Sequence, residues 1–148
     1  SRTKSKRPDP FNLIAALLLT HYSPPGTVTR TRLETFVDPK WEIVERELRS
    51  MDSYEKPLLD LLQHKDLPGA NMLSVTGGNG VFHVQIADAQ MNWHQAFDPE
   101  GPSDTVEVWR SDQGFEAPQN WTWSIDDAAT LVRYYYQHGK PHPDYNWL

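Results

Sequence analysis

The sequence predicts a single α+β domain, in which an antiparallel sheet of four to six strands has helices packed on one face. Two runs of strand-forming residues within Asn71–Ala87 are joined by the glycine-rich stretch GGNG, which is typical of a hairpin. Two segments, residues 39–51 and 125–138, carry apolar residues at helical spacing. The 148 residues suit one domain with a hydrophobic core better than two.

Composition indicates a folded chain that favours basic partners. Apolar residues make up 38% of the chain and charged residues 23%, and six Trp and six Tyr are more large aromatics than a disordered chain carries. The absence of cysteine excludes disulfides and thiolate metal sites. The net charge is −6, but residues 1–10 hold four Lys/Arg and one Asp, so the remainder sums to −9. A body of that sign repels nucleic-acid phosphates and attracts cationic proteins.

The N-terminal part predicts an arm and two elements. Residues 1–10, SRTKSKRPDP, are basic and rich in turn formers, so we expect a flexible arm, and residues 11–148 form the domain. The run FNLIAALLLTHY at residues 11–22 predicts a buried helix, since it is shorter than the roughly 20 residues of a membrane span and matches a secretion signal poorly. Alternation through residues 27–37 predicts an edge strand.

The next segment predicts a helix and then a strand. Asp38 is a typical N-cap and Pro39 a typical first helical residue. The apolar residues that follow at helical spacing are Trp41, Val44, Leu48 and Met51. Residues 56–64 hold a short apolar run between turn formers, which favours a strand.

The central hairpin and the segments after it predict an antiparallel meander. In the second half of the hairpin, Phe82, Val84 and Ile86 alternate with polar residues, as in a strand with one buried face. Further strands are predicted at residues 91–97 and 105–110, and a loop at residues 111–120.

The C-terminal part predicts a short strand, a well-delimited helix and a tail. Residues 121–123 form the strand, and Ser124 caps the helix. The apolar stripe of this helix consists of Ile125, Ala128, Ala129, Val132, Tyr135 and Tyr136. Gly139 stands where a helix-ending glycine belongs, and we expect the aromatic tail to fold back on the domain.

No motif of nucleophilic or phosphate chemistry is present. The chain has no GxSxG elbow and no cysteine nucleophile, and the GGNG stretch leads into a strand instead of a helix N-terminus. His83 and His94 on neighbouring strands, with Asp88 or Asp98 nearby, leave open a His₂-carboxylate metal site and hence a small metal-dependent hydrolase. The alternative is that both are ordinary surface histidines on the solvent-facing side of a sheet.

An acidic and aromatic cluster is the most informative functional feature. Between residues 88 and 116 the carboxylates are Asp88, Asp98, Glu100, Asp104, Glu107, Asp112 and Glu116, with a single Arg. Trp93, Trp109 and Phe115 lie among them. Carboxylates steer an encounter with a basic partner and aromatics anchor the complex, whereas the alternative is a solvated loop face with core tryptophans. The predicted contact residues are Asp98, Glu100, Asp104, Asp112, Phe115 and Glu116.

The order of motifs resembles a known family over residues 38–148. The motifs are a helix begun by Pro39-Lys40-Trp41, the GGNG hairpin, SDQGF at residues 111–115, a Ser-capped helix, and the terminal pattern from Tyr135 to Trp147. This order resembles immunity proteins of bacterial polymorphic toxin systems, in particular the large actinobacterial family found beside deaminase-type and nuclease toxins.

The resemblance implies a cytosolic, non-catalytic protein that binds a cognate toxin. The acidic and aromatic cluster predicts in addition that this toxin is basic near its active-site cleft and that the protein occludes the cleft. We expect no cofactor, no metal, and no role for nucleic acid or membrane. It carries over no contact residues, because these vary with the toxin. The readings that remain beside it are the metal-dependent hydrolase and a non-catalytic domain of a larger protein.

Overall fold

The computed structural model describes residues 12–22, 31–110 and 113–148. The arm expected at residues 1–10 and the first part of the strand expected at residues 27–37 lie outside these ranges. The elements are β1 (Ala16–Tyr22), β2 (Thr31–Val37), α1 (Trp41–Arg49), β3 (Leu58–Leu62), β4 (Met72–Gly78), β5 (Val81–Ala87), β6 (Trp93–Phe97), β7 (Thr105–Arg110), β8 (Gln113–Pro118), the 3₁₀ turn η1 (Gln119–Trp121), β9 (Thr122–Trp123), α2 (Ile125–His138) and β10 (Asn146–Trp147).

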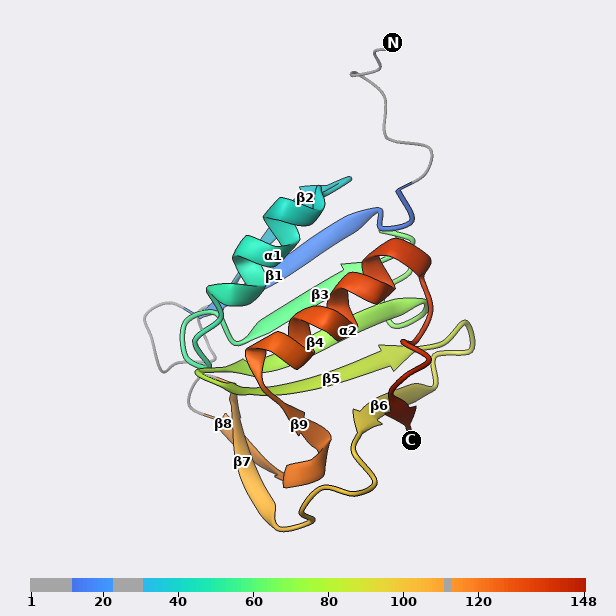
Figure 1. The fold of residues 1–148 in the computed structure, drawn as a ribbon. Coiled ribbons are helices and arrows are strands. Elements are labelled where there is room, and N and C mark those ends of the chain that lie inside the picture. The colour runs from blue at the N-terminus through green and yellow to red at the C-terminus, as the bar shows by residue number, and fades with distance from the viewer. Residues whose placement is uncertain (1–11, 23–30, 111–112) are drawn as a thin grey trace.

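One large antiparallel sheet forms the body of the protein (Figure 1). Its strand order is β10-β6-β5-β4-β3-β1-β2, and β9 pairs with β5 beside β6. The described residues thus form an eight-stranded sheet and a separate two-stranded sheet, β7–β8. The predicted α+β class and antiparallel arrangement are confirmed, but the expected four to six strands were too few.

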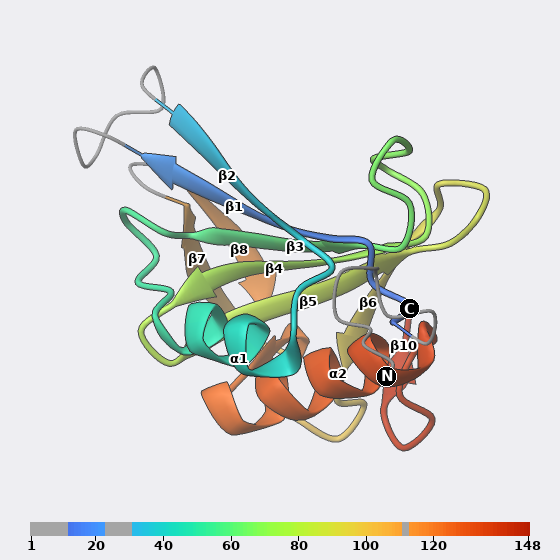
Figure 2. The same ribbon diagram turned by 90° about the horizontal axis from the view of Figure 1, so that it is seen from above.

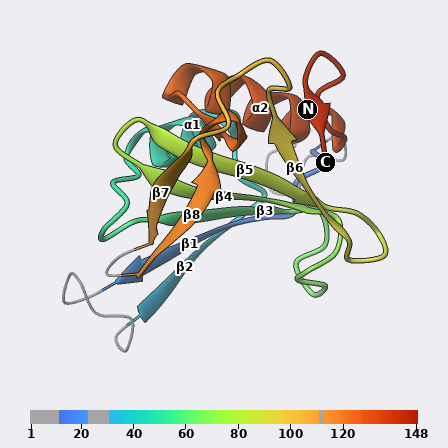
Figure 3. The same cartoon turned by 90° about the horizontal axis from the view of Figure 1, so that it is seen from below.

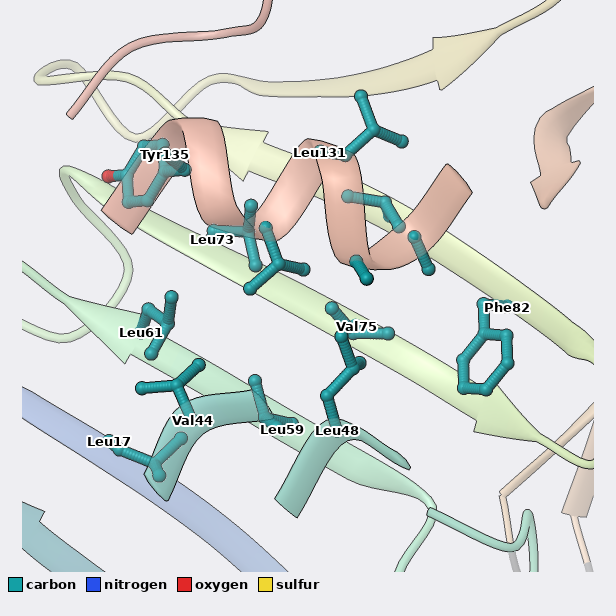
Figure 4. Packing of buried hydrophobic residues seen from close by; sticks show 14 of the residues in the cluster. Leu17, Val44, Leu48, Leu59, Leu61, Leu73, Val75, Phe82, Leu131 and Tyr135 are labelled. Carbon is teal, nitrogen blue, oxygen red and sulfur yellow. The ribbon is translucent and has the colours of Figure 1, made fainter. Parts of the chain in front are cut away.

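Both α-helices lie on the same face of the large sheet, as predicted (Figure 2). Their buried side chains meet the inward side chains of β1, β3, β4 and β5 in one core, part of which is drawn in Figure 4. The fully buried large side chains of this core include Leu17, Leu48, Leu59, Leu61, Leu73, Val75, Val84, Leu131 and Tyr135. No helix within the described residues is long and apolar enough to cross a membrane.

The β4–β5 hairpin is confirmed, and its glycines have clear backbone reasons. Asn79 and Gly80 form the turn with φ of 53° and 87°, in the left-handed region that these residues tolerate. Gly78 has φ of 146°, and a Cβ there would lie 2.4 Å from the backbone nitrogen of Ser53. The backbone of the hairpin at Gly78 therefore lies in close contact with the backbone of residues 52–53.

The buried helix predicted for residues 11–22 is wrong, because this segment contains strand β1. β1 lies between β2 and β3, so both of its edges are hydrogen-bonded, and both of its faces carry buried or partly buried residues. Leu17 and Leu19 enter the main core, whereas Leu18 packs on the other face against a small cluster of Leu62, Met72 and Ala87. A strand buried on both faces reads as a continuous apolar run and loses the alternation that identifies strands.

Helix α1 exists as predicted but begins at Trp41, with Lys40 as its N-cap residue instead of Asp38. Asp38 adopts a left-handed conformation with φ of 49°. The Pro39 carbonyl accepts hydrogen bonds from the Asn12 side chain (3.2 Å) and the Tyr136 hydroxyl (2.7 Å). Because this carbonyl is held by tertiary contacts, the helix starts two residues later than the capping signal indicates.

The predicted helix and the returning tail are confirmed, whereas the strand expected at residues 121–123 covers only Thr122–Trp123, because Trp121 belongs to η1. The Ser124 hydroxyl accepts a hydrogen bond from the Asp127 backbone N–H at 3.3 Å, and Gly139 ends α2 with φ of 66°. The tail returns to the sheet, where β10 pairs with β6. The Trp147 indole donates to the His142 carbonyl at 3.1 Å and packs against the main core.

Candidate protein-binding face

The acidic and aromatic cluster is built largely on the β7–β8 hairpin. Strand β7 is confirmed at residues 105–110, but the loop predicted for residues 111–120 is wrong because β8 occupies much of it. β7 contacts β4 and β5, and the hairpin crosses the direction of these strands (Figure 3). Gly114 and Pro118 are turn-forming residues, and for that reason the sequence favoured a loop. Pairing with β7 nevertheless makes this segment a strand.

The two faces of the hairpin have different surroundings. Val108 and Ala117 are 1% and 2% exposed and form the covered face. Phe115 pairs with Val108 on this same face, and its ring meets the His83 ring edge-on at 5.7 Å between centroids. Glu107 and Glu116 are directly opposite each other on the other face, which also carries Trp109.

The carboxylates of the hairpin and of the loop before it are exposed and form no ion pair within the described residues. They are Asp98, Glu100, Asp104, Glu107 and Glu116. Because their charge is not cancelled by a nearby cation there, this part of the surface has a negative potential that reaches solvent.

Hydrogen bonds tie the acidic loop before β7 to the turn η1. The Asn120 side chain donates to the Asp98 carbonyl at 3.0 Å, and the Asp98 N–H donates to the Asn120 carbonyl at 2.8 Å. The Asp98 carboxylate accepts from the Glu100 N–H at 3.0 Å. The Gln119 N–H donates to the Asp104 carbonyl at 2.6 Å. The loop is thus held in a defined shape that displays its carboxylates.

The predicted contact residues do not all share one face. Asp98, Glu100 and Asp104 lie in the loop before β7, and Glu116 lies on the exposed face of the hairpin. Phe115 is directed to the opposite face of the hairpin, although 41% of it remains exposed. Asp112 lies outside the described residues.

The tryptophans divide between core and surface. Trp41, Trp123 and Trp147 pack against the main core. Trp93 and Trp109 are 39% and 42% exposed. Trp109 therefore presents an exposed aromatic ring on the same hairpin as carboxylates that form no ion pair among the described residues, a placement that the sequence pattern left open.

A cavity of about 590 Å³ adjoins the hairpin and was not predicted. Glu107 and Trp109 line it from β7, and Asp52 and Tyr54 line it from the segment after α1. Tyr54 is 47% exposed. Nothing in the sequence around Tyr54 marks it as functional, since more than fifty positions separate it from Trp109 and only the fold brings the two together.

The candidate metal pair of histidines is not brought together. Ile86 pairs with His94, so His94 shares the helix-covered face, whereas His83 projects from the opposite face of β5. The His94 ring nitrogen Nε2 lies 3.1 Å from the Asp88 carboxylate, and this hydrogen bond lowers the pKa of Asp88. No group of three or more candidate metal ligands occurs among the described residues.

His83 is instead an unusual buried group. It is 6% exposed, its ring stacks on Trp121 at 6.4 Å between centroids, and its Nε2 finds no hydrogen-bond partner among the described residues. Burial disfavours the charged imidazolium and lowers the pKa of His83 to about 4. We interpret His83 as a structural element under the hairpin.

Comparison with known proteins finds no family model that matches the chain and no curated protein that matches it. The resemblance to toxin-immunity proteins therefore rests on the sequence motifs.

Proposed function

We propose that this protein is an immunity protein, which binds a cognate toxin and occludes a basic active-site cleft. The observation that carries the proposal is a set of exposed carboxylates that form no ion pair with any described residue and lie beside the exposed Trp109, on the β7–β8 hairpin and its preceding loop. The motif resemblance supplies the class of partner. The protein acts by covering the cleft, and the proposal involves no catalysis by this chain.

Charge accounts for the encounter in this proposal. Negative potential over the hairpin and loop speeds association with a cationic cleft, where rates rise by about 10- to 1000-fold through steering. In the free protein the carboxylates of Glu107 and Glu116, which lie opposite each other across the two strands, repel each other. A cation supplied by the partner would relieve that repulsion, which favours binding over the free state.

Aromatic anchors account for the strength of the complex. Interface hot spots are enriched in Trp, Tyr and Arg, and they cost at least about 2 kcal/mol when truncated. Trp109 and Tyr54 present half-exposed rings on either side of one cavity next to the carboxylates. Such rings bury a large area with little loss of side-chain entropy.

A growth assay tests the proposal. The product of the gene next to the one for this protein, as the candidate toxin, is expressed with the wild-type protein or with a triple variant, Asp98→Lys, Glu100→Lys and Asp104→Lys. The matched control reverses three exposed carboxylates in other elements, Glu42, Asp66 and Asp144, and changes the net charge equally. We expect the control to protect cells as the wild type does, and the triple variant to need higher expression for protection.

Two results would contradict the proposal. One is wild-type protein that fails to protect against the neighbouring gene product although both accumulate as folded proteins. The other is equal protection by both triple variants at every expression level, which would remove the acidic loop from the binding surface.

A further inference from the structure

We infer that the cavity between the β7–β8 hairpin and residues 52–54 receives the guanidinium group of an arginine side chain from the partner protein. This inference rests on the proposed function and names the chemical group recognised at that surface. The cavity of about 590 Å³ is large enough for an arginine and part of the loop that carries it.

The walls of the cavity suit a flat cation. Trp109 and Tyr54 line it with rings that are 42% and 47% exposed. A guanidinium group stacks on aromatic faces because it is planar, delocalised and weakly hydrated, and a ring's negative face attracts the cation. A lysine ammonium lacks the planar shape, and a neutral ligand lacks the charge.

The Glu107 carboxylate in the cavity wall carries a negative charge that complements the positive charge of a guanidinium group. Glu107 lines the cavity, is exposed, and forms no ion pair with any described residue. A carboxylate in this position can accept two parallel N–H hydrogen bonds from a guanidinium group. Glu116 stands directly opposite Glu107 across the hairpin and adds to the negative potential at the rim.

The floor of the cavity is preformed. The Asn79 side chain donates to the Asp52 carbonyl at 2.8 Å, and the Ser53 N–H donates to the Gly77 carbonyl at 3.1 Å. The Asp52 carboxylate accepts from the Tyr54 and Lys56 N–H groups at 3.0 and 2.8 Å, which fixes the turn that presents the Tyr54 ring. A site that is already ordered loses less entropy when it binds.

A small probe tests the cavity without the toxin. Nα-acetyl-arginine methylamide is added to ¹⁵N-labelled protein while the Trp109 indole N–H and the Gly78 amide are followed by NMR. The matched probe is the citrulline analogue, which has nearly the same shape and no charge. We expect both signals to shift with the arginine probe, with a dissociation constant of about 1–10 mM, and the citrulline probe to bind at least about tenfold more weakly.

Variants locate the interaction. Glu107→Gln keeps the size of the exposed side chain, and we expect it to weaken the arginine probe at least about tenfold. Tyr54→Leu removes an exposed ring, and we expect about a threefold loss. Glu42→Gln, in α1 and outside the cavity lining, is expected to leave the probe affinity unchanged.

The results separate this inference from the proposed function. Absence of shifts at Trp109 and Gly78, or equal binding of the two probes, would overturn the guanidinium site even if the toxin still bound. Probe binding that Glu107→Gln abolishes would support the site even if the neighbouring gene product proved not to be a partner.

Discussion

Glu107 and Glu116 occupy directly opposed positions in the β7–β8 hairpin, with both side chains on the same exposed face. Like charges placed opposite each other across two strands destabilise the pair. Neither carboxylate is neutralised by a cation among the described residues. The free domain is therefore less stable at this position than it would be with an oppositely charged pair.

Replacing one glutamate of this pair with lysine should stabilise the free protein. We expect Glu116→Lys to raise the free energy of unfolding by about 0.5 kcal/mol, because a repulsive cross-strand pair becomes an attractive one. Urea unfolding measures the change. Glu100→Lys makes the same charge change in a loop without a cross-strand partner and serves as the control. Equal changes in the two variants would show that the opposed pair has no specific energetic effect.

Burial of His83 should make the stability of the protein depend on pH. The unfolded chain takes up a proton near pH 6.5, whereas the folded protein resists it until about pH 4, the lowered pKa of His83. The contribution of neutral His83 to the free energy of unfolding is therefore fully present above pH 6.5. As the pH falls toward 4, the free energy of unfolding decreases by about 3 kcal/mol in total.

A non-titrating side chain at position 83 should remove this contribution. We expect His83→Leu to flatten the slope of unfolding free energy between pH 4 and 6.5, as measured by urea unfolding at several pH values. An NMR titration of the His83 ring in the wild type provides a direct reading of its pKa. A wild-type slope in the variant would assign the pH dependence to other groups.

Truncation of a buried and of an exposed leucine of the sheet should change the free energy of unfolding by very different amounts. Leu73 in β4 is 0% exposed and lies in the core shown in Figure 4, whereas Leu33 in the edge strand β2 is 60% exposed. We expect Leu73→Ala to lower the free energy of unfolding by about 2–5 kcal/mol through lost burial and a cavity. Leu33→Ala should change it by less than about 0.5 kcal/mol. Similar losses at the two positions would contradict this core.

The capping hydroxyl of α2 should have a measurable effect. Ser124→Ala removes the acceptor of the Asp127 N–H and should cost about 1 kcal/mol of unfolding free energy. Ser103→Ala, at an exposed loop residue with no capping role, is the matched control and should be near neutral. Thermal unfolding of the two variants side by side measures the difference.

Local sequence signals predicted the elements whose conformation is decided locally. The hairpin at Asn79-Gly80 and the helix from Ser124 to Gly139 depend on turn and cap chemistry, which adjacent residues carry. Strand β1 was mistaken for a helix because the partly buried Leu18 packs on the face opposite the buried Leu17, so apolar residues occur on both faces and no alternation was visible.

Tertiary contacts decided the features that sequence patterns missed. β8 is a strand because β7 pairs with it, and the start of α1 depends on the Tyr136 hydroxyl that holds Pro39. At the candidate site the acidic loop was predicted from composition. The approach of Tyr54 to Trp109 required the fold, as did the separation of His83 from His94 onto opposite faces of the sheet.

The rate of association with the product of the gene next to this one, the candidate toxin of the proposed function, tests the central claim most directly. Stopped-flow measurements over a range of salt concentrations compare the wild type with the triple variant at Asp98, Glu100 and Asp104 and with the control at Glu42, Asp66 and Asp144. We expect the acidic-loop variant to associate about 10- to 100-fold more slowly at low salt, with a weaker dependence on salt, and the control to match the wild type. The same association rate for both triple variants would contradict the claim that this loop and hairpin recognise a basic partner.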